Sequence, residues 1–211
     1  MKKALIVGDS HVDWGHFGKE LAAQLRTLGY AVTKAGVGGT SARSWAKPRV
    51  CTPNKKRCLD VAPLRGAWDL VLISLGTNDA ANANRAGGGE ARFRETASRV
   101  DALARTLGGK RTVWILPPTL RGNVSWYTQA AADSLYAQAH RAREVVPFDS
   151  RPSTREVVTR KSGDGVHPGL VVSRKWASAV TKAAQRPSLR GVWISAAALL
   201  LLTIGVRLAQ K

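Results

Sequence analysis

Short apolar runs recur along the chain, and each is followed by glycine or polar residues. Residues 4–7, 69–75 and 112–116 form largely apolar runs of strand length, which is typical of parallel strands buried on both faces. Residues 30–35 and 144–148 predict two further strands. The pattern therefore predicts five strands, the first of which begins almost at Met1.

Segments with helical periodicity separate these strands. The first covers roughly residues 16–28, where Phe17, Leu21, Leu25 and Leu28 share one face and Gly29 closes the helix. Further helices are expected around 90–107, near 127–142 and over about 169–185. Strands that alternate with helices predict an α/β protein with a parallel sheet in three layers. The segment 42–66 shows neither the alternation typical of a strand nor the spacing typical of a helix, and we expect an irregular basic loop there.

The chain divides into one domain and a tail. Residues 1–186 contain all the predicted strands and amphipathic helices and are expected to form the domain. Residues 187–190 are expected to be a linker, and 191–207 an apolar C-terminal helix.

The tail has a sequence of a different kind from the domain. Sixteen residues, 191–206, carry no charge and lie between Arg190 and Arg207. As a helix they would span about 24 Å, somewhat less than the roughly 30 Å hydrocarbon core of a bilayer, and the flanking arginines can snorkel. We expect this transmembrane-like segment to hold the protein at a membrane. The alternative is a helix buried against a neighbouring subunit.

The N-terminal apolar run is too short for a signal peptide, because it covers only four residues. The domain is therefore expected on the cytoplasmic side of that membrane, with residues 207–211 crossing it.

The charge balance bears on partners. The chain has 33 Lys and Arg against 14 Asp and Glu, a formal net charge of +19, and the segments 41–66 and 151–190 are especially basic. Such a surface attracts polyanions such as nucleic acid or anionic lipid. The alternative is a set of solvated faces that keep the protein soluble.

Cys51 and Cys58 are the only cysteines, and a turn containing Pro53 and Asn54 separates them. This spacing allows either a small-loop disulfide or two free thiols. A zinc site is disfavoured because no histidine or second cysteine pair lies at ligand spacing.

Four short motifs carry the candidate chemistry, and each follows a predicted strand or loop. In chain order they are Gly8-Asp9-Ser10, Gly39, Gly76-Thr77-Asn78-Asp79 and Asp164-Gly165-Val166-His167-Pro168. With these motifs the sequence resembles the SGNH (GDSL-type) hydrolase family, over most of residues 4–185. The resemblance implies a flavodoxin-like five-stranded parallel sheet and a serine esterase that needs no metal or cofactor.

The resemblance also assigns roles. Ser10 would be the nucleophile, since a hydroxyl reacts only when an adjacent base takes its proton, and His167 would be that base. Asp164 would fix the tautomer of His167 and steady the imidazolium. The N–H groups of Ser10 and Gly39 and the side-chain amide of Asn78 would form the oxyanion hole.

Two departures from the family pattern leave these groups in place. His11 stands where a leucine or isoleucine usually follows the serine, and Lys34 stands near the place of an asparagine. The register of the glycine-rich turn also leaves Gly36 and Gly38 as alternatives to Gly39. These departures leave the subfamily undetermined, and the substrate therefore also stays open.

Several polar residues near the motifs are expected to have structural roles. Asp9 is expected to bond local backbone, and Asp79 to brace the turn at residues 76–78. Three histidines without a matching catalytic role are expected at the surface or as satisfied core residues: His11, His16 and His140.

The predicted function is hydrolysis of a carboxylic ester through an acyl-enzyme on Ser10. Family members act on lipids, thioesters and acetylated sugars, so the basic domain and apolar tail favour a lipid or an O-acyl or O-acetyl glycan of a cell envelope. The alternative is a bacteriophage virion component that keeps the hydrolase shell and binds polyanions or membrane.

Overall fold

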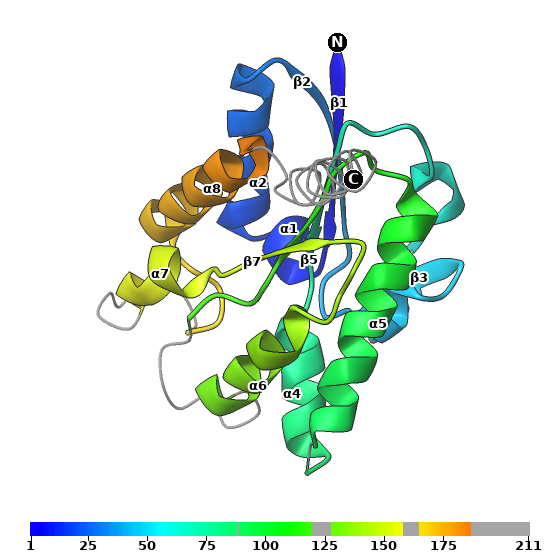
Figure 1. The fold of residues 1–211 in the computed structure, drawn as a ribbon, viewed down its shortest axis with the longest axis vertical. Coiled ribbons are helices and arrows are strands. Elements are labelled where there is room, and N and C mark those ends of the chain that lie inside the picture. Colours follow the sequence, from blue (N-terminus) through cyan, green and yellow to red (C-terminus); the bar gives the residue numbers. More distant parts are fainter. Residues whose placement is uncertain (88, 120–127, 158–164, 187–211) are drawn as a thin grey trace, which may run out of the picture.

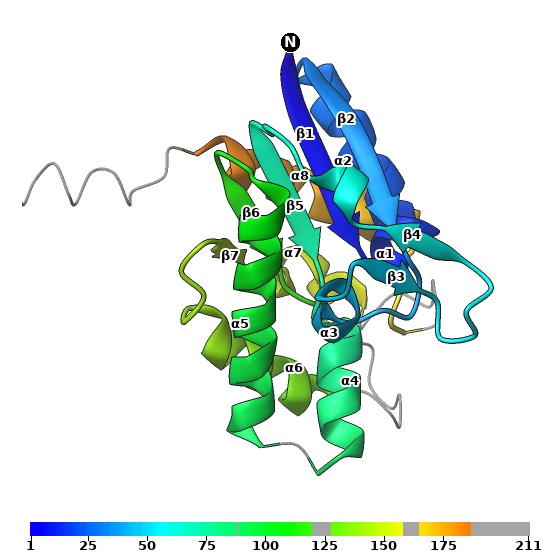
Figure 2. The same ribbon diagram turned by 90° about the vertical axis from the view of Figure 1, so that its right-hand side faces the viewer.

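The computed structural model describes residues 1–87, 89–119, 128–157 and 165–186. A five-stranded parallel sheet runs through them (Figure 1; Figure 2). In spatial order its strands are β2 (Tyr30–Gly36), β1 (Lys2–Gly8), β5 (Leu70–Ser74), β6 (Thr112–Ile115) and β7 (Val146–Phe148). The predicted flavodoxin-like order is confirmed, since the second strand along the chain lies at the edge and the first lies beside it.

The central strands are apolar because both of their faces are covered. In β1, Leu5 and Val7 join one buried cluster, whereas Ala4 and Ile6 join the cluster on the opposite face. This alternation follows from the two-residue period of a strand. All five residues of β5 are buried, as expected for the middle of a covered parallel sheet.

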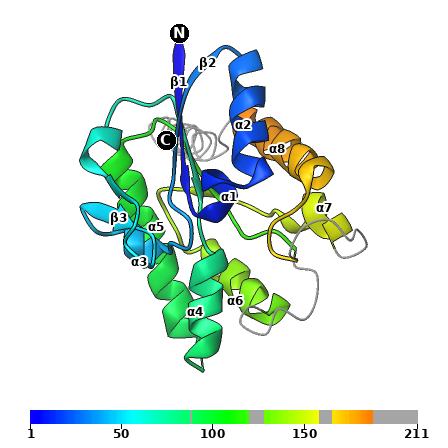
Figure 3. The same ribbon diagram turned by 180° about the vertical axis from the view of Figure 1, so that it is seen from behind.

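Helices cover both faces of the sheet (Figure 1; Figure 3). On one face lie α2 (His16–Thr27) and α8 (Leu170–Gln185), whose Phe17 and Trp176 rings stack with centroids 3.6 Å apart. The other face carries α4 (Thr77–Arg85), α5 (Glu90–Leu107) and α6 (Gln129–Ala139). This is the predicted three-layer arrangement.

Most helix boundaries lie close to their predicted positions. Helix α5 covers the predicted residues and ends at Gly108, whose φ of 75° is a left-handed conformation that favours glycine. Helix α4 was not predicted, because it is short and contains no apolar side chain larger than alanine. Three further short helical elements are α1 (Ser10–Asp13), α7 (Arg151–Thr154) and the 3₁₀ turn η2 (Arg155–Val157).

The expectation of an irregular loop over residues 42–66 is wrong. The segment contains α3 (Ala42–Trp45), a hairpin of β3 (Arg49–Cys51) and β4 (Cys58–Asp60), and the 3₁₀ turn η1 (Ala62–Leu64). These elements are too short for a periodic pattern, but they are anchored by five apolar side chains in the core: Ala42, Trp45, Val50, Val61 and Leu64. Figure 2 shows the hairpin beside the carboxyl ends of β1 and β2.

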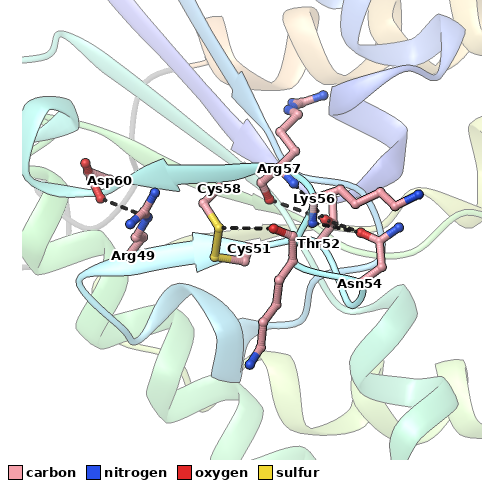
Figure 4. Close-up of a disulfide and its surroundings, with 9 residues drawn as sticks. Arg49, Cys51, Thr52, Asn54, Lys56, Arg57, Cys58 and Asp60 are labelled. Carbon is pink, nitrogen blue, oxygen red and sulfur yellow. Dashed lines mark hydrogen bonds and ion pairs between the residues drawn. A yellow bond between two sulfur atoms is a disulfide. The ribbon is translucent and has the colours of Figure 1, made fainter.

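Cys51 and Cys58 form a disulfide across this hairpin, where they face each other as paired residues of β3 and β4 (Figure 4). The sequence allowed either a disulfide or two free thiols, and the structure contains the disulfide.

Within the described part of the chain, no helix is both long and apolar enough to cross a membrane. The predicted linker at 187–190 and the apolar tail at 191–207 lie outside the described residues.

Candidate active site

The first and last motifs meet at the carboxyl edge of the sheet. Strand β1 ends at Gly8, and Asp9 then caps the short helix α1, whose first residue is Ser10. His167 lies just before α8, and its Nε2 atom is 2.7 Å from the Ser10 Oγ atom. Residues 157 positions apart are thus placed within hydrogen-bonding distance, as the proposed nucleophile and base require.

The expected orienting acid, Asp164, lies outside the described residues. The ring of His167 is flanked by two aromatic side chains from α1 and its C-terminal end. The Trp14 ring centroid lies 4.2 Å away, and that of His11 lies 4.9 Å away.

His11 is buried, and both of its ring nitrogens lie within hydrogen-bonding distance of an oxygen. Its Nδ1 atom lies 3.0 Å from Asp9 Oδ1, and its Nε2 atom lies 3.0 Å from the carbonyl oxygen of Val166. The edge of the ring meets Trp176 of α8. The expectation of a satisfied core histidine is confirmed for His11, and its contact with Val166 reaches the segment that carries His167.

Asp9 also does what the sequence predicts. Its carboxylate accepts a hydrogen bond from the His11 backbone N–H at 3.0 Å, which caps α1. Its second oxygen lies 3.4 Å from the side-chain nitrogen of Asn78. Asp9 therefore links the first motif to the third.

The glycine-rich turn after β2 supplies the second motif. The backbone N–H of Gly38 donates to the Asp13 carboxylate at 2.9 Å, so this donor is already used. At Gly36 an added Cβ would lie 2.4 Å from the Asp13 nitrogen, which shows how closely this residue packs on α1. Gly39 has a φ of 72°, a conformation that side chains rarely adopt. Gly36 and Gly38 are thus both engaged with α1, and the assignment of Gly39 as the oxyanion donor stays a prediction.

Asn78 joins the second and third motifs. It lies in the first turn of α4, and its side-chain nitrogen donates to the Thr40 carbonyl oxygen at 2.9 Å. Since the same nitrogen also approaches Asp9, the structure brings Asn78, the turn at Gly39 and the residue before Ser10 together. The residues expected to form the oxyanion hole therefore lie next to one another, and their role stays a prediction.

Asp79 has a different partner from the one expected. Its buried carboxylate accepts the backbone N–H of Ala42, at 3.1 and 3.0 Å to the two oxygens, and lies 3.5 Å from the Thr96 hydroxyl. It thus fixes the start of α3, and it also bonds its own backbone N–H in the first turn of α4. Burial, with the Asp9 charge as a smaller contribution, raises the pKa of Asp79 to about 6.

Lys34 is the second departure from the family pattern, and its side chain binds the C-terminal end of α1. Its ammonium group donates to the carbonyl oxygens of Val12 and Asp13 at 2.8 and 2.9 Å. Burial lowers the pKa of this lysine. The residue lies under the helix that carries Ser10, and it satisfies carbonyl groups at the helix C-terminus.

Comparison with known proteins agrees with this geometry. Residues 6–171 match the GDSL-like lipase/acylhydrolase family, a segment that begins within β1, covers the other strands and includes all four motifs. The chain belongs to this family. It is therefore a carboxylic ester hydrolase of the SGNH type.

Solved structures share the fold at low sequence identity. An α/β hydrolase enzyme from the metagenome of Lake Arreo, Spain, LAE5, is 18% identical, with a TM-score of 0.62 over 87% of this chain and 94% of its own. Axe2, an acetylxylan esterase from Geobacillus stearothermophilus, is 18% identical, with a TM-score of 0.58 over 88% and 95%. The M. smegmatis aryl esterase is 18% identical, with a TM-score of 0.55 over 87% and 98%. No curated protein matches the sequence.

Proposed function

We propose that this hydrolase cleaves its ester through an acyl-enzyme on Ser10, with His167 as general base and Asp164 as the residue that orients it. The observation that carries the proposal is the 2.7 Å contact between Ser10 Oγ and His167 Nε2. A serine and a histidine in this arrangement can exchange a proton while the oxygen attacks a carbonyl carbon.

In this mechanism the Ser10 oxygen bonds to the ester carbon while its proton moves to Nε2 of His167. The carbonyl oxygen becomes an oxyanion, which the N–H groups of Ser10 and Gly39 and the amide of Asn78 would stabilise. When the intermediate collapses, the bond to the alcohol breaks and the alcohol takes the proton from His167. Water then attacks the acyl-enzyme by the same route and releases the acid.

Two observations bear on the substrate. Axe2 and the M. smegmatis protein share the fold and are named as an acetylxylan esterase and an aryl esterase. The strong positive charge of the chain favours an ester in an anionic setting. We therefore propose a cell-envelope ester, either an O-acyl or O-acetyl glycan or a lipid.

The test is hydrolysis of 4-nitrophenyl acetate together with labelling by a fluorophosphonate. Ser10→Ala and His167→Ala should both abolish hydrolysis, and Ser10→Ala should also abolish labelling, with circular dichroism unchanged. Asn78→Ala should lower kcat by about 10²–10³, as removal of an oxyanion donor usually does. Activity of Ser10→Ala within a few-fold of wild type would exclude Ser10 as the nucleophile.

The cellular location is a separate proposal that rests on the sequence alone. The sixteen uncharged residues at 191–206 support attachment of the protein to a membrane. Deletion of residues 187–211 should leave esterase activity intact and move the protein out of the membrane fraction. If full-length protein is instead a detergent-free oligomer that the deletion converts to monomers, the attachment is wrong. The alternative location, in a phage virion, stays a sequence-based prediction.

A further inference from the structure

The hairpin of β3 and β4 touches the proposed oxyanion turn. A Cβ placed on Gly39 would lie 3.0 Å from both Cγ and Cδ of Pro53, so the proline ring packs directly against this glycine. Pro53 belongs to the six residues between the two cysteines. The hairpin tip is therefore a neighbour of the reacting carbonyl in the proposed mechanism.

Arg57 ties the tip to the same turn. Its guanidinium donates to the Gly36 carbonyl oxygen and pairs with the Asp13 carboxylate at 2.6 Å. The other Asp13 oxygen accepts the N–H of Gly38. The charge of Arg57 is thus matched by an acid, and its role is to hold the hairpin on the turn.

The tip is also cross-linked and internally bonded. The disulfide between Cys51 and Cys58 closes its base, and the Thr52 N–H donates to the Arg57 carbonyl oxygen at 2.9 Å (Figure 4). The Thr52 hydroxyl and the Lys56 N–H both donate to the Asn54 side-chain oxygen. A loop fixed in this way loses little conformational entropy when it binds a ligand.

Two cations on this tip are not matched by acids. Lys55 and Lys56 are exposed, and within the described ranges neither ammonium group pairs with a carboxylate. Arg49, lower in the hairpin, pairs with Asp60 at 3.6 Å. The Lys56 side chain points away from the disulfide (Figure 4). Two uncompensated positive charges are therefore held on a rigid support next to Gly39.

We propose that Lys55 and Lys56 bind the anionic groups of the substrate, which would be an ester carried on an acidic glycan. This inference rests on the proposed esterase function and specifies its substrate class. The tip residues are Thr, Pro, Asn, Lys, Lys and Arg, with no large apolar side chain that could enter an acyl layer. This composition favours a water-soluble anionic chain over a lipid surface.

The experiment compares a tip variant with a charge-matched control. Lys55→Gln/Lys56→Gln removes the two tip charges. Lys2→Gln/Lys3→Gln removes two exposed charges at the amino end of β1, the opposite edge of the sheet from the site. Each double substitution is made in the wild-type protein, where kinetics are measured. It is also made in Ser10→Ala, where binding of a fluorescent oligogalacturonide is measured by fluorescence anisotropy.

The tip variant should bind the oligogalacturonide about tenfold more weakly than the control at low salt, and the difference should shrink in about 0.5 M NaCl. Its kcat/KM should fall to a similar extent for acetylated oligogalacturonide but stay unchanged for acetylated xylo-oligosaccharide and 4-nitrophenyl acetate. Equal weakening in both double variants would overturn the inference, because the charge effect would then be spread over the whole surface.

A different outcome is that the protein binds anionic vesicles through Lys55 and Lys56 and fails to bind oligogalacturonide. That result would overturn the inference in favour of a lipid surface. A wild-type enzyme that cleaves all three esters without preference would also overturn it, while the proposed esterase function stands. A wild-type protein that cleaves none of them and is not labelled by a fluorophosphonate refutes the proposed Ser10 mechanism itself, and the two failures are thereby distinguished.

Discussion

The Nε2 atom of His11 lies 3.0 Å from the carbonyl oxygen of Val166, a residue 155 positions later and next to His167. The other ring nitrogen lies 3.0 Å from Asp9 Oδ1. Because a carbonyl and a carboxylate are both acceptors, the two contacts are satisfied together when both nitrogens carry a proton. The ring thus joins the residue before Ser10 to the residue before His167.

This arrangement predicts a positioning role for His11. His11→Leu fills the buried site with an apolar side chain of similar size but removes both contacts, so His167 should be held less accurately against Ser10. We expect kcat to fall about ten- to a hundredfold with KM little changed, and stability to fall by about 1–3 kcal/mol.

His11→Gln is the matched control, because its amide can still donate to the Val166 carbonyl oxygen. It should recover much of kcat. Steady-state kinetics and urea unfolding on the three proteins separate the two effects. A leucine variant that is destabilised but keeps wild-type kcat would show that His11 serves packing alone.

Trp14 is the second residue near the site whose position suggests a function. It is 57% exposed, although it is a large apolar side chain, and its ring lies 4.2 Å from that of His167. An added Cβ on Gly38 would lie 3.1 Å from the indole nitrogen. The exposed indole therefore adjoins both the proposed base and the oxyanion turn, and we predict that the substrate contacts it.

Trp14→Ala should raise KM about tenfold for the preferred ester, since loss of a ring contact in a binding site costs roughly 1–2 kcal/mol. Because the side chain is exposed, Tm should change by only a few degrees. Trp14→Phe should show a smaller increase in KM. The control is Leu28→Ala, which removes an exposed apolar residue at the C-terminal end of α2. An unchanged KM in Trp14→Ala would contradict a substrate contact.

The sequence was sufficient to predict the sheet and the proximity of Ser10 and His167, because both leave local signals. Apolar runs such as residues 69–75 mark buried parallel strands, and the four motifs bring Ser10 and His167 to one edge of the sheet. The contact of His11 with Val166 left no local signal, since it depends on where two distant segments meet. The hairpin within residues 42–66 was missed because three-residue strands are too short to show a period.

The disulfide predicts an effect that can be separated from catalysis. Cys51→Ser/Cys58→Ser releases a small loop, and by the chain-entropy relation this should lower the free energy of unfolding by about 2 kcal/mol. The hairpin should also become less rigid on Gly39, so affinity for oligogalacturonide should fall while kcat for 4-nitrophenyl acetate stays near wild type. Chemical unfolding and anisotropy measure the two effects. The proposed link between the cross-link and anion binding is wrong if affinity is unchanged.

Asp79 predicts a pH dependence of stability. Its folded-state pKa is raised from 3.8 to about 6, chiefly by burial, so between these values the folded protein binds more protons than the unfolded chain. The contribution of Asp79 to the free energy of unfolding is therefore fully present below about pH 4 and is lost as the pH rises through 6. The shift corresponds to about 3 kcal/mol.

Asp79→Asn removes this titration and keeps an oxygen that can accept the Ala42 N–H. Because other carboxylates titrate in the same range, the quantity to follow is the difference in unfolding free energy between wild type and variant. Urea unfolding at several pH values from about 4 to 7.5 should show wild type losing roughly 2–3 kcal/mol relative to Asp79→Asn, with most of the loss between pH 4 and 6. A difference that is constant over this range would mean that Asp79 is ionised in the folded protein throughout, and that the Ala42 and Thr96 contacts offset its burial.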